Sequence, residues 1–96
     1  MSQIRFEWDS RKAASNEKKH GISFEEAQSV FFDEQALLLE DPQPRHEEER
    51  FILLGLSVSL RLLVVVHALR ERDVIRIISA RKATRKEIRE YEIRLR

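Results

Sequence analysis

The stretch FILLGLSVSLRLLVVVHALRERDVIRIIS, residues 51–79, decides the fold. It contains three apolar runs, at 51–56, 61–69 and 73–79, which are joined by short polar links. Runs spaced this closely predict an antiparallel meander, because a short link reverses the chain at once. The middle run is apolar almost throughout, so we expect it to be a central strand covered on both faces.

Upstream of this stretch the sequence predicts a strand and then a helix. Apolar and charged residues alternate over 4–8, as in a short strand. Asp9 or Ser10 is expected to cap a helix that runs through Lys19. Gly21 then ends the helix, because glycine adopts the left-handed conformation of a helix C-cap without strain.

Two further helices are predicted from one capping pattern. Ser23 and Glu26 have the spacing of a capping box, in which each side chain accepts a hydrogen bond from the other residue's backbone. Thr84 and Glu87 repeat that spacing and begin a final helix. We expect this last helix to pack through a stripe that includes Tyr91.

Together these segments predict a single α+β domain over residues 1–96. It comprises an N-terminal strand, two helices, an antiparallel sheet of three or four strands and a C-terminal helix. A short strand is also expected at 36–39, and Pro42 and Pro44 predict a loop after it. The absence of cysteine excludes disulfide scaffolds and thiolate zinc sites and suits a reducing compartment. The N-terminus lacks a signal-like pattern and no apolar run is long enough to cross a bilayer, so we expect a cytoplasmic protein without membrane contact.

The formal net charge of +1 conceals an uneven distribution. Residues 1–50 carry 7 Lys and Arg against 12 Asp and Glu, whereas residues 51–96 carry 11 against 5. This distribution favours an anionic partner for the second half. The alternative is that the two halves neutralise each other in the folded protein.

The residue types exclude several kinds of chemistry. The chain has only two glycines and no glycine-rich phosphate loop, and its histidines lie in different predicted elements without a spaced set of acids. We therefore expect no cofactor and, if the protein is an enzyme, metal-free catalysis. RNA cleavage suits such groups, because the 2′-hydroxyl is an internal nucleophile beside the phosphate.

Polar residues in the apolar runs are the first candidates for a site. Arg76 interrupts the run 74–78, where a guanidinium is costly unless it is paired or faces an open groove. Its alternative is an edge position with the head group in water. Strict alternation places Arg76 on one face of the strand and Ser79 and Arg81 on the other. His67 ends the most apolar run, where its alternative is an ordinary packing role.

The start of the final helix is the second candidate region. We expect Ser79, Arg81 and Arg85 to gather at the junction between strand and helix, where the helix N-terminus also favours phosphate. Arg85, Lys86 and Arg89 either follow a nucleic-acid backbone or form the solvated face of the helix.

Six segments occur in the order typical of one protein family. They are Phe6-Glu7-Trp8-Asp9, Lys19-His20-Gly21-Ile22-Ser23-Phe24-Glu25-Glu26-Ala27, Glu49-Arg50-Phe51, Gly55-Leu56-Ser57, Leu62-Leu63-Val64-Val65-Val66-His67 and Ile75-Arg76-Ile77-Ile78-Ser79-Ala80-Arg81-Lys82-Ala83-Thr84. Together they closely resemble the BrnT family over nearly the whole chain.

BrnT proteins are the toxins of type II toxin–antitoxin pairs. The resemblance implies a RelE-like fold and a metal-independent endoribonuclease that cleaves RNA and inhibits translation. It implies neutralisation by a BrnA-type ribbon-helix-helix antitoxin, in a complex with two copies of each protein that reaches operator DNA only through the antitoxin. Two alternatives stay open: a non-catalytic nucleic-acid-binding or regulatory module that uses the basic C-terminal half, and a module that docks an acidic protein.

The resemblance also carries site residues onto this chain. The matching polar positions are Lys19, His20, Glu25, His67, Arg76, Ser79 and Arg81. Either His67 or Glu25 is expected to be the general base. Arg76 and Arg81 are expected to hold the phosphate.

Lys19 or His20 is expected to protonate the leaving oxygen, although both suit the C-terminal end of a helix on charge alone.

The chain departs from the family pattern at two places. The turn 57–60 lacks the usual glycine or similar turn former, and Ala68 replaces a common threonine after the strand-ending histidine.

Overall fold

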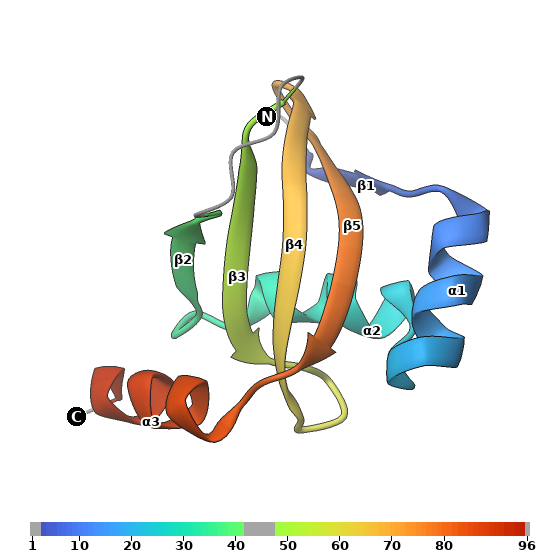
Figure 1. Cartoon of the computed structure of the whole chain (residues 1–96). Helices are drawn as coiled ribbons and strands as arrows, with labels where there is room; N and C mark the ends of the chain where they lie inside the picture. Colours follow the sequence, from blue (N-terminus) through green and yellow to red (C-terminus); the bar gives the residue numbers. More distant parts are fainter. Residues whose placement is uncertain (1–2, 42–47, 96) are drawn as a thin grey trace.

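The computed structural model describes residues 3–41 and 48–95, so the predicted loop at Pro42 and Pro44 lies outside the described residues. The elements, in chain order, are β1 (Arg5–Glu7), α1 (Ser10–His20), α2 (Phe24–Ser29), the 3-10 helix η1 (Val30–Phe32), β2 (Leu37–Glu40), β3 (Arg50–Leu56), β4 (Leu62–Glu71), β5 (Val74–Lys82) and α3 (Arg85–Arg94) (Figure 1). The predicted helices and strands are all present, with ends shifted by one to three residues.

The strands form one sheet in the order β1-β5-β4-β3-β2. The predicted antiparallel meander of β3, β4 and β5 is confirmed, and β4 lies at its centre. The sheet has five strands rather than three or four, because the short β1 pairs parallel to β5 and the short β2 pairs antiparallel to β3. The α+β class is therefore confirmed with a larger, mixed sheet.

The two faces of the sheet are covered differently. One face, which we call the helical face, packs against α1, α2 and η1 through Leu53, Val65 and Ile77, which are fully or nearly fully buried. Asn16 ties α1 to this face, because its side-chain amide exchanges hydrogen bonds of 2.9 and 3.0 Å with the backbone of Ala80.

The opposite face, which we call the open face, is covered by a helix only at one end. There α3 packs Tyr91 against Leu54 and Val64. Figure 1 shows α2 behind the strands and α3 across their lower end in front. Among the described residues, α3 is the helix that packs on this face.

A bulge in β5 changes the faces that simple alternation predicts. Val66 pairs with Ser79 and His67 with Ile77, so Ile78 is an extra residue in β5. Cross-strand neighbours share a face. Because of the extra residue, Ser79 lies on the open face, together with Arg76 and Arg81. The predicted separation of Arg76 from Ser79 and Arg81 is wrong.

The predicted capping box of α2 forms only in part. Ser23 Oγ accepts a hydrogen bond from the backbone N–H of Glu26 at 3.0 Å, as expected. The Glu26 carboxylate instead accepts hydrogen bonds from Arg61 and from the hydroxyl of Ser57. The charged partner outweighs the local backbone donor because a bidentate guanidinium bond is charge-assisted.

The capping box of α3 is confirmed, with Thr84 and Glu87 each accepting from the other's backbone N–H. Tyr91 is buried as predicted, and its hydroxyl donates a 2.6 Å hydrogen bond to Asp33. Burial, and then the carboxylate beside it, raise the pKa of Tyr91 to about 12. The helix is therefore anchored at both its first turn and its buried tyrosine.

Candidate functional site

Two arginines face one another across the open face. Arg76 on β5 is opposite Ala68 on β4, and Ala68 is opposite Arg50 on β3. The three residues form one row, with Glu7 of β1 next to Arg76 at its end. Ala68 is completely buried and contributes only a methyl group. The row therefore places two arginines on either side of a small residue.

Arg76 is held loosely. Its Nη1 lies 3.9 Å from the carboxylate of Glu48, the outer limit for an ion pair, and both side chains are about a quarter exposed. Arg76 also lines a polar cleft of about 390 Å³, together with Glu7, Trp8, Asp9 and Arg70. An arginine in this position retains the capacity to bind a further anion.

Arg81 is on the same face, but its side chain is bound to α3. Its guanidinium donates two hydrogen bonds to the carboxylate of Glu87, at 2.9 and 3.0 Å. These bonds, followed by the backbone donor of Thr84, lower the pKa of Glu87 to about 2. Ser79 and Arg81 lie in the last four residues of β5, and Arg81 is bonded to the first turn of α3. The predicted phosphate cluster of Ser79, Arg81 and Arg85 stays a prediction.

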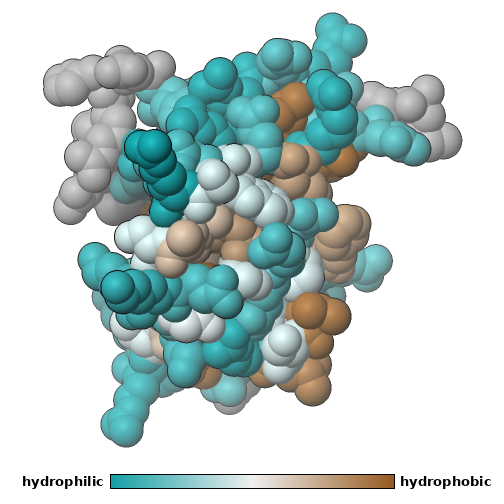
Figure 2. All heavy atoms as spheres, turned by 90° about the vertical axis from the view of Figure 1, so that its right-hand side faces the viewer, coloured by the Kyte–Doolittle hydropathy of each residue, from teal (hydrophilic) through white to brown (hydrophobic). Residues whose placement is uncertain are grey.

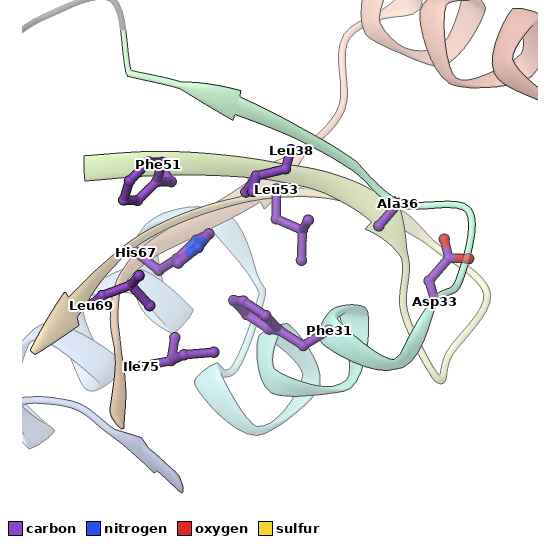
Figure 3. Close-up of a pocket in the computed structure, with 9 residues that line it drawn as sticks. All are labelled: Phe31, Asp33, Ala36, Leu38, Phe51, Leu53, His67, Leu69 and Ile75. Atoms are coloured by element: carbon purple, nitrogen blue, oxygen red, sulfur yellow. The ribbon is translucent and has the colours of Figure 1, made fainter. Parts of the chain in front are cut away.

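His67 lies on the helical face, away from the arginine row. Its ring is 4% exposed and packs edge-on against Phe31, at 4.8 Å between ring centroids. Figure 3 shows the ring in an apolar pocket of about 340 Å³, among side chains that include Phe51 and Leu53. Burial lowers the pKa of His67, and its Nδ1 is 3.4 Å from the carbonyl of Val65. The structure does not bring His67 together with Arg76, Ser79 or Arg81.

The remaining predicted residues lie on helices. Lys19 and His20 are in the last turn of α1, and Glu25 is exposed in the first turn of α2. All three belong to elements that cover the helical face. The side of the molecule that carries α1 is mainly hydrophilic, with apolar surface only in patches (Figure 2). Arg85 and Arg89 are exposed on α3.

Sequence reasoning did not select Glu48 and Arg50 as site residues. Glu48 follows the undescribed residues 42–47, and Arg50 opens an apolar strand, where it resembles an ordinary strand-end cation. A signal for Arg50 was present, since it belongs to the family-like segment Glu49-Arg50-Phe51. The row itself was not predictable without the strand register.

The described residues contain no group of three or more His, Cys, Asp or Glu side chains placed to hold a metal ion. Among the same residues, no helix has the length and apolar character needed to span a membrane.

Comparison with known proteins adds a family match. Residues 8–87 match the family model described as "Ribonuclease toxin, BrnT, of type II toxin-antitoxin system". The fold is similar to the crystal structure of the ribonuclease toxin BrnT of Brucella abortus, with a TM-score of 0.65 and 21% sequence identity, over 86% of this chain and 100% of that one. No protein of curated function matches the sequence significantly.

Proposed function

The chain belongs to the BrnT family of ribonuclease toxins of type II toxin–antitoxin systems, and on this basis we propose that it cleaves RNA without a metal ion, at the open face of its sheet. The observation that carries the location is the alignment of Arg76 with Ala68 and Arg50 on the face that no helix covers beyond α3. Such a surface can bind an extended, negatively charged RNA strand.

The chemistry follows from the groups on that face. Glu48, the carboxylate beside Arg76, takes the proton of the 2′-hydroxyl as general base. The 2′-oxygen attacks the adjacent phosphorus, and Arg76 stabilises the extra negative charge of the phosphorane. The 5′-oxygen leaves with a proton from water, which gives a 2′,3′-cyclic phosphate and a 5′-hydroxyl. Ser79 on the same face donates a hydrogen bond to a phosphate oxygen.

Family membership also implies an antitoxin partner. We propose that this partner is a BrnA-type ribbon-helix-helix protein, that two copies of each protein form the complex, and that only the antitoxin contacts operator DNA. In its absence the toxin acts in the cytoplasm and inhibits translation by degrading RNA. The exposed Arg85 and Arg89 of α3 are available to RNA or to the antitoxin.

RNA cleavage in excess EDTA tests the activity. Purified protein, shown to be folded and free of antitoxin, is expected to produce fragments that end in 2′,3′-cyclic phosphate. Arg76→Met should reduce the cleavage rate by about 10²-fold or more, because a preorganised positive charge is lost where charge develops. Arg11→Met, which removes a charge from the exposed side of α1, is the matched control. Intact RNA with folded wild-type protein, at any salt concentration, would rule out metal-free cleavage.

The same assay tests where the site lies. His67→Phe, which fits the apolar pocket, should leave the rate within about twofold, because His67 faces away from the arginine row. The predicted roles of Lys19, His20 and Glu25 are tested in the same way by Lys19→Met, His20→Asn and Glu25→Gln. If a folded His67→Phe variant is inactive while Arg76→Met is active, the site is on the helical face instead. RNA binding without cleavage would favour the non-catalytic alternative.

A further inference from the structure

The open face contains a buried donor without an acceptor. Among the described residues, the Nε of Arg50 is the one buried side-chain nitrogen or oxygen without a hydrogen-bond partner. Buried polar groups are almost always paired, because an unsatisfied donor costs about 1–3 kcal/mol. The Arg50 guanidinium gains the missing acceptor if its side chain turns towards an anion on the open face.

The position of Arg50 identifies that ligand as an anion. Arg50 and Arg76 are both opposite Ala68, from the strands on either side of β4. Strands in a sheet are about 4.8 Å apart, so the backbones of the two arginines are separated by roughly 10 Å. Ala68 between them contributes only a methyl group and is itself fully covered. Two guanidinium groups at this separation are able to approach one phosphate from opposite sides.

The acid next to Arg76 supports the same reading. Glu48 precedes Arg50 by two residues and pairs with Arg76 at 3.9 Å. Its carboxylate occupies the neighbourhood of Arg76 when no other anion is present. Arg50, in contrast, makes no ion pair among the described residues. The row of Arg50, Ala68 and Arg76 can therefore bind one further anionic group between the two arginines.

We propose that Arg50 and Arg76 form a clamp for a single phosphate of the RNA strand, in which Arg50 is a substrate-binding residue. This rests on the proposed function for the identity of the strand, but the clamp itself requires only a phosphodiester. The Arg50 side chain turns so that its guanidinium contacts the phosphate, and Arg76 contacts it from the other side. The 2′-hydroxyl beside that phosphate then lies within reach of Glu48.

Arg50→Met tests the clamp, because methionine keeps the apolar stem and removes the guanidinium. We expect the cleavage rate at limiting RNA to fall by about 10²-fold or more, while the melting temperature stays within about 2 °C of the wild type or rises. The combination is diagnostic, since a merely structural arginine would lower the melting temperature and leave cleavage intact. Arg11→Met is again the control and should change neither quantity.

A binding measurement separates failure of the clamp from failure of the proposed function. The probe is a fluorescent single-stranded oligonucleotide of mixed sequence with 2′-deoxy sugars, which keeps the phosphates but cannot be cleaved through a 2′-hydroxyl. Arg50→Met should weaken its binding about tenfold or more relative to Arg11→Met. If the wild type cleaves no RNA but this difference persists, the clamp stands and the ribonuclease proposal fails. If Arg50→Met binds and cleaves like the wild type, the clamp is wrong whatever the activity.

Discussion

Leu60 carries backbone strain in the turn between β3 and β4. It is the one non-glycine residue of the described chain with a positive φ, at 62°. The left-handed conformation costs an L-amino acid about 1–2 kcal/mol, and the side chain of Leu60 is 78% exposed, so little packing offsets that cost. The resemblance to the BrnT family already marks this turn as one without the expected glycine or similar turn former.

Leu60→Gly should therefore stabilise the protein. Glycine removes the strain but adds freedom to the unfolded chain, so we expect a net gain of about 0.5–1 kcal/mol in the free energy of unfolding. Urea denaturation of the purified protein measures it. Val58→Gly is the matched control in the same turn, since Val58 is also exposed but its φ is negative, and it should destabilise slightly. Equal losses in both variants would show that the turn is not strained at Leu60.

At the scale of elements, sequence patterns were most reliable where one local rule decides the outcome. The capping box of α3 and the glycine end of α1 formed as predicted, because the partners are a few residues apart. In the cap of α2, Glu26 binds Arg61 instead of the backbone of Ser23, and no local pattern reveals this partner, which lies just before β4. The bulge at Ile78 was likewise not predictable from local sequence, because the alternation of residue types along β5 contains no sign of the extra residue. This one insertion decided which arginines share a face.

The link between β5 and α3 gives a pH-dependent prediction. Glu87 accepts two hydrogen bonds from Arg81 and also caps the helix at Thr84. Its pKa is about 2 in the folded protein against an ordinary value of 4.5, so the ionised form stabilises folding above pH 4.5. That contribution disappears as the pH falls from 4.5 towards 2.

Glu87→Gln should isolate the charge, because the amide oxygen still accepts from the backbone of Thr84. Arg81 is 42% and Glu87 26% exposed, so solvent screening limits the loss to about 1 kcal/mol at pH 7. Denaturation curves at pH 7 and pH 3 measure the difference from the wild type, which should be clearly smaller at pH 3. A difference that is the same at both pH values would assign the effect to the helix cap instead of the ion pair.

At the scale of the whole molecule, the fold changes the meaning of the charge distribution. Three ion pairs join an acid of residues 1–50 to an arginine of residues 51–96: Glu26 with Arg61, Glu7 with Arg70 and Glu48 with Arg76. The two halves thus neutralise each other at these points, as the alternative interpretation of the sequence held. The sequence contained the charges but not their partners, because each pair depends on how strands and helices come together.

Salt dependence of RNA binding tests how much of the basic half is free to bind phosphate. If the excess of basic residues formed one continuous surface, about six phosphates would be contacted, and the logarithm of the binding constant would fall with the logarithm of salt concentration with a slope of about −4. With Arg61 and Arg70 already paired and Arg50 and Arg76 forming the clamp, we expect two or three contacts and a slope of about −1.5 to −2. Fluorescence anisotropy of the 2′-deoxy oligonucleotide between about 50 and 200 mM salt measures this slope.

Arg50→Met should reduce the slope by about 0.7, the value of one phosphate contact, whereas Arg11→Met should leave the slope unchanged. A slope near −4 that Arg50→Met does not alter would show that RNA is held by a broad basic surface, and the clamp would not be the principal contact.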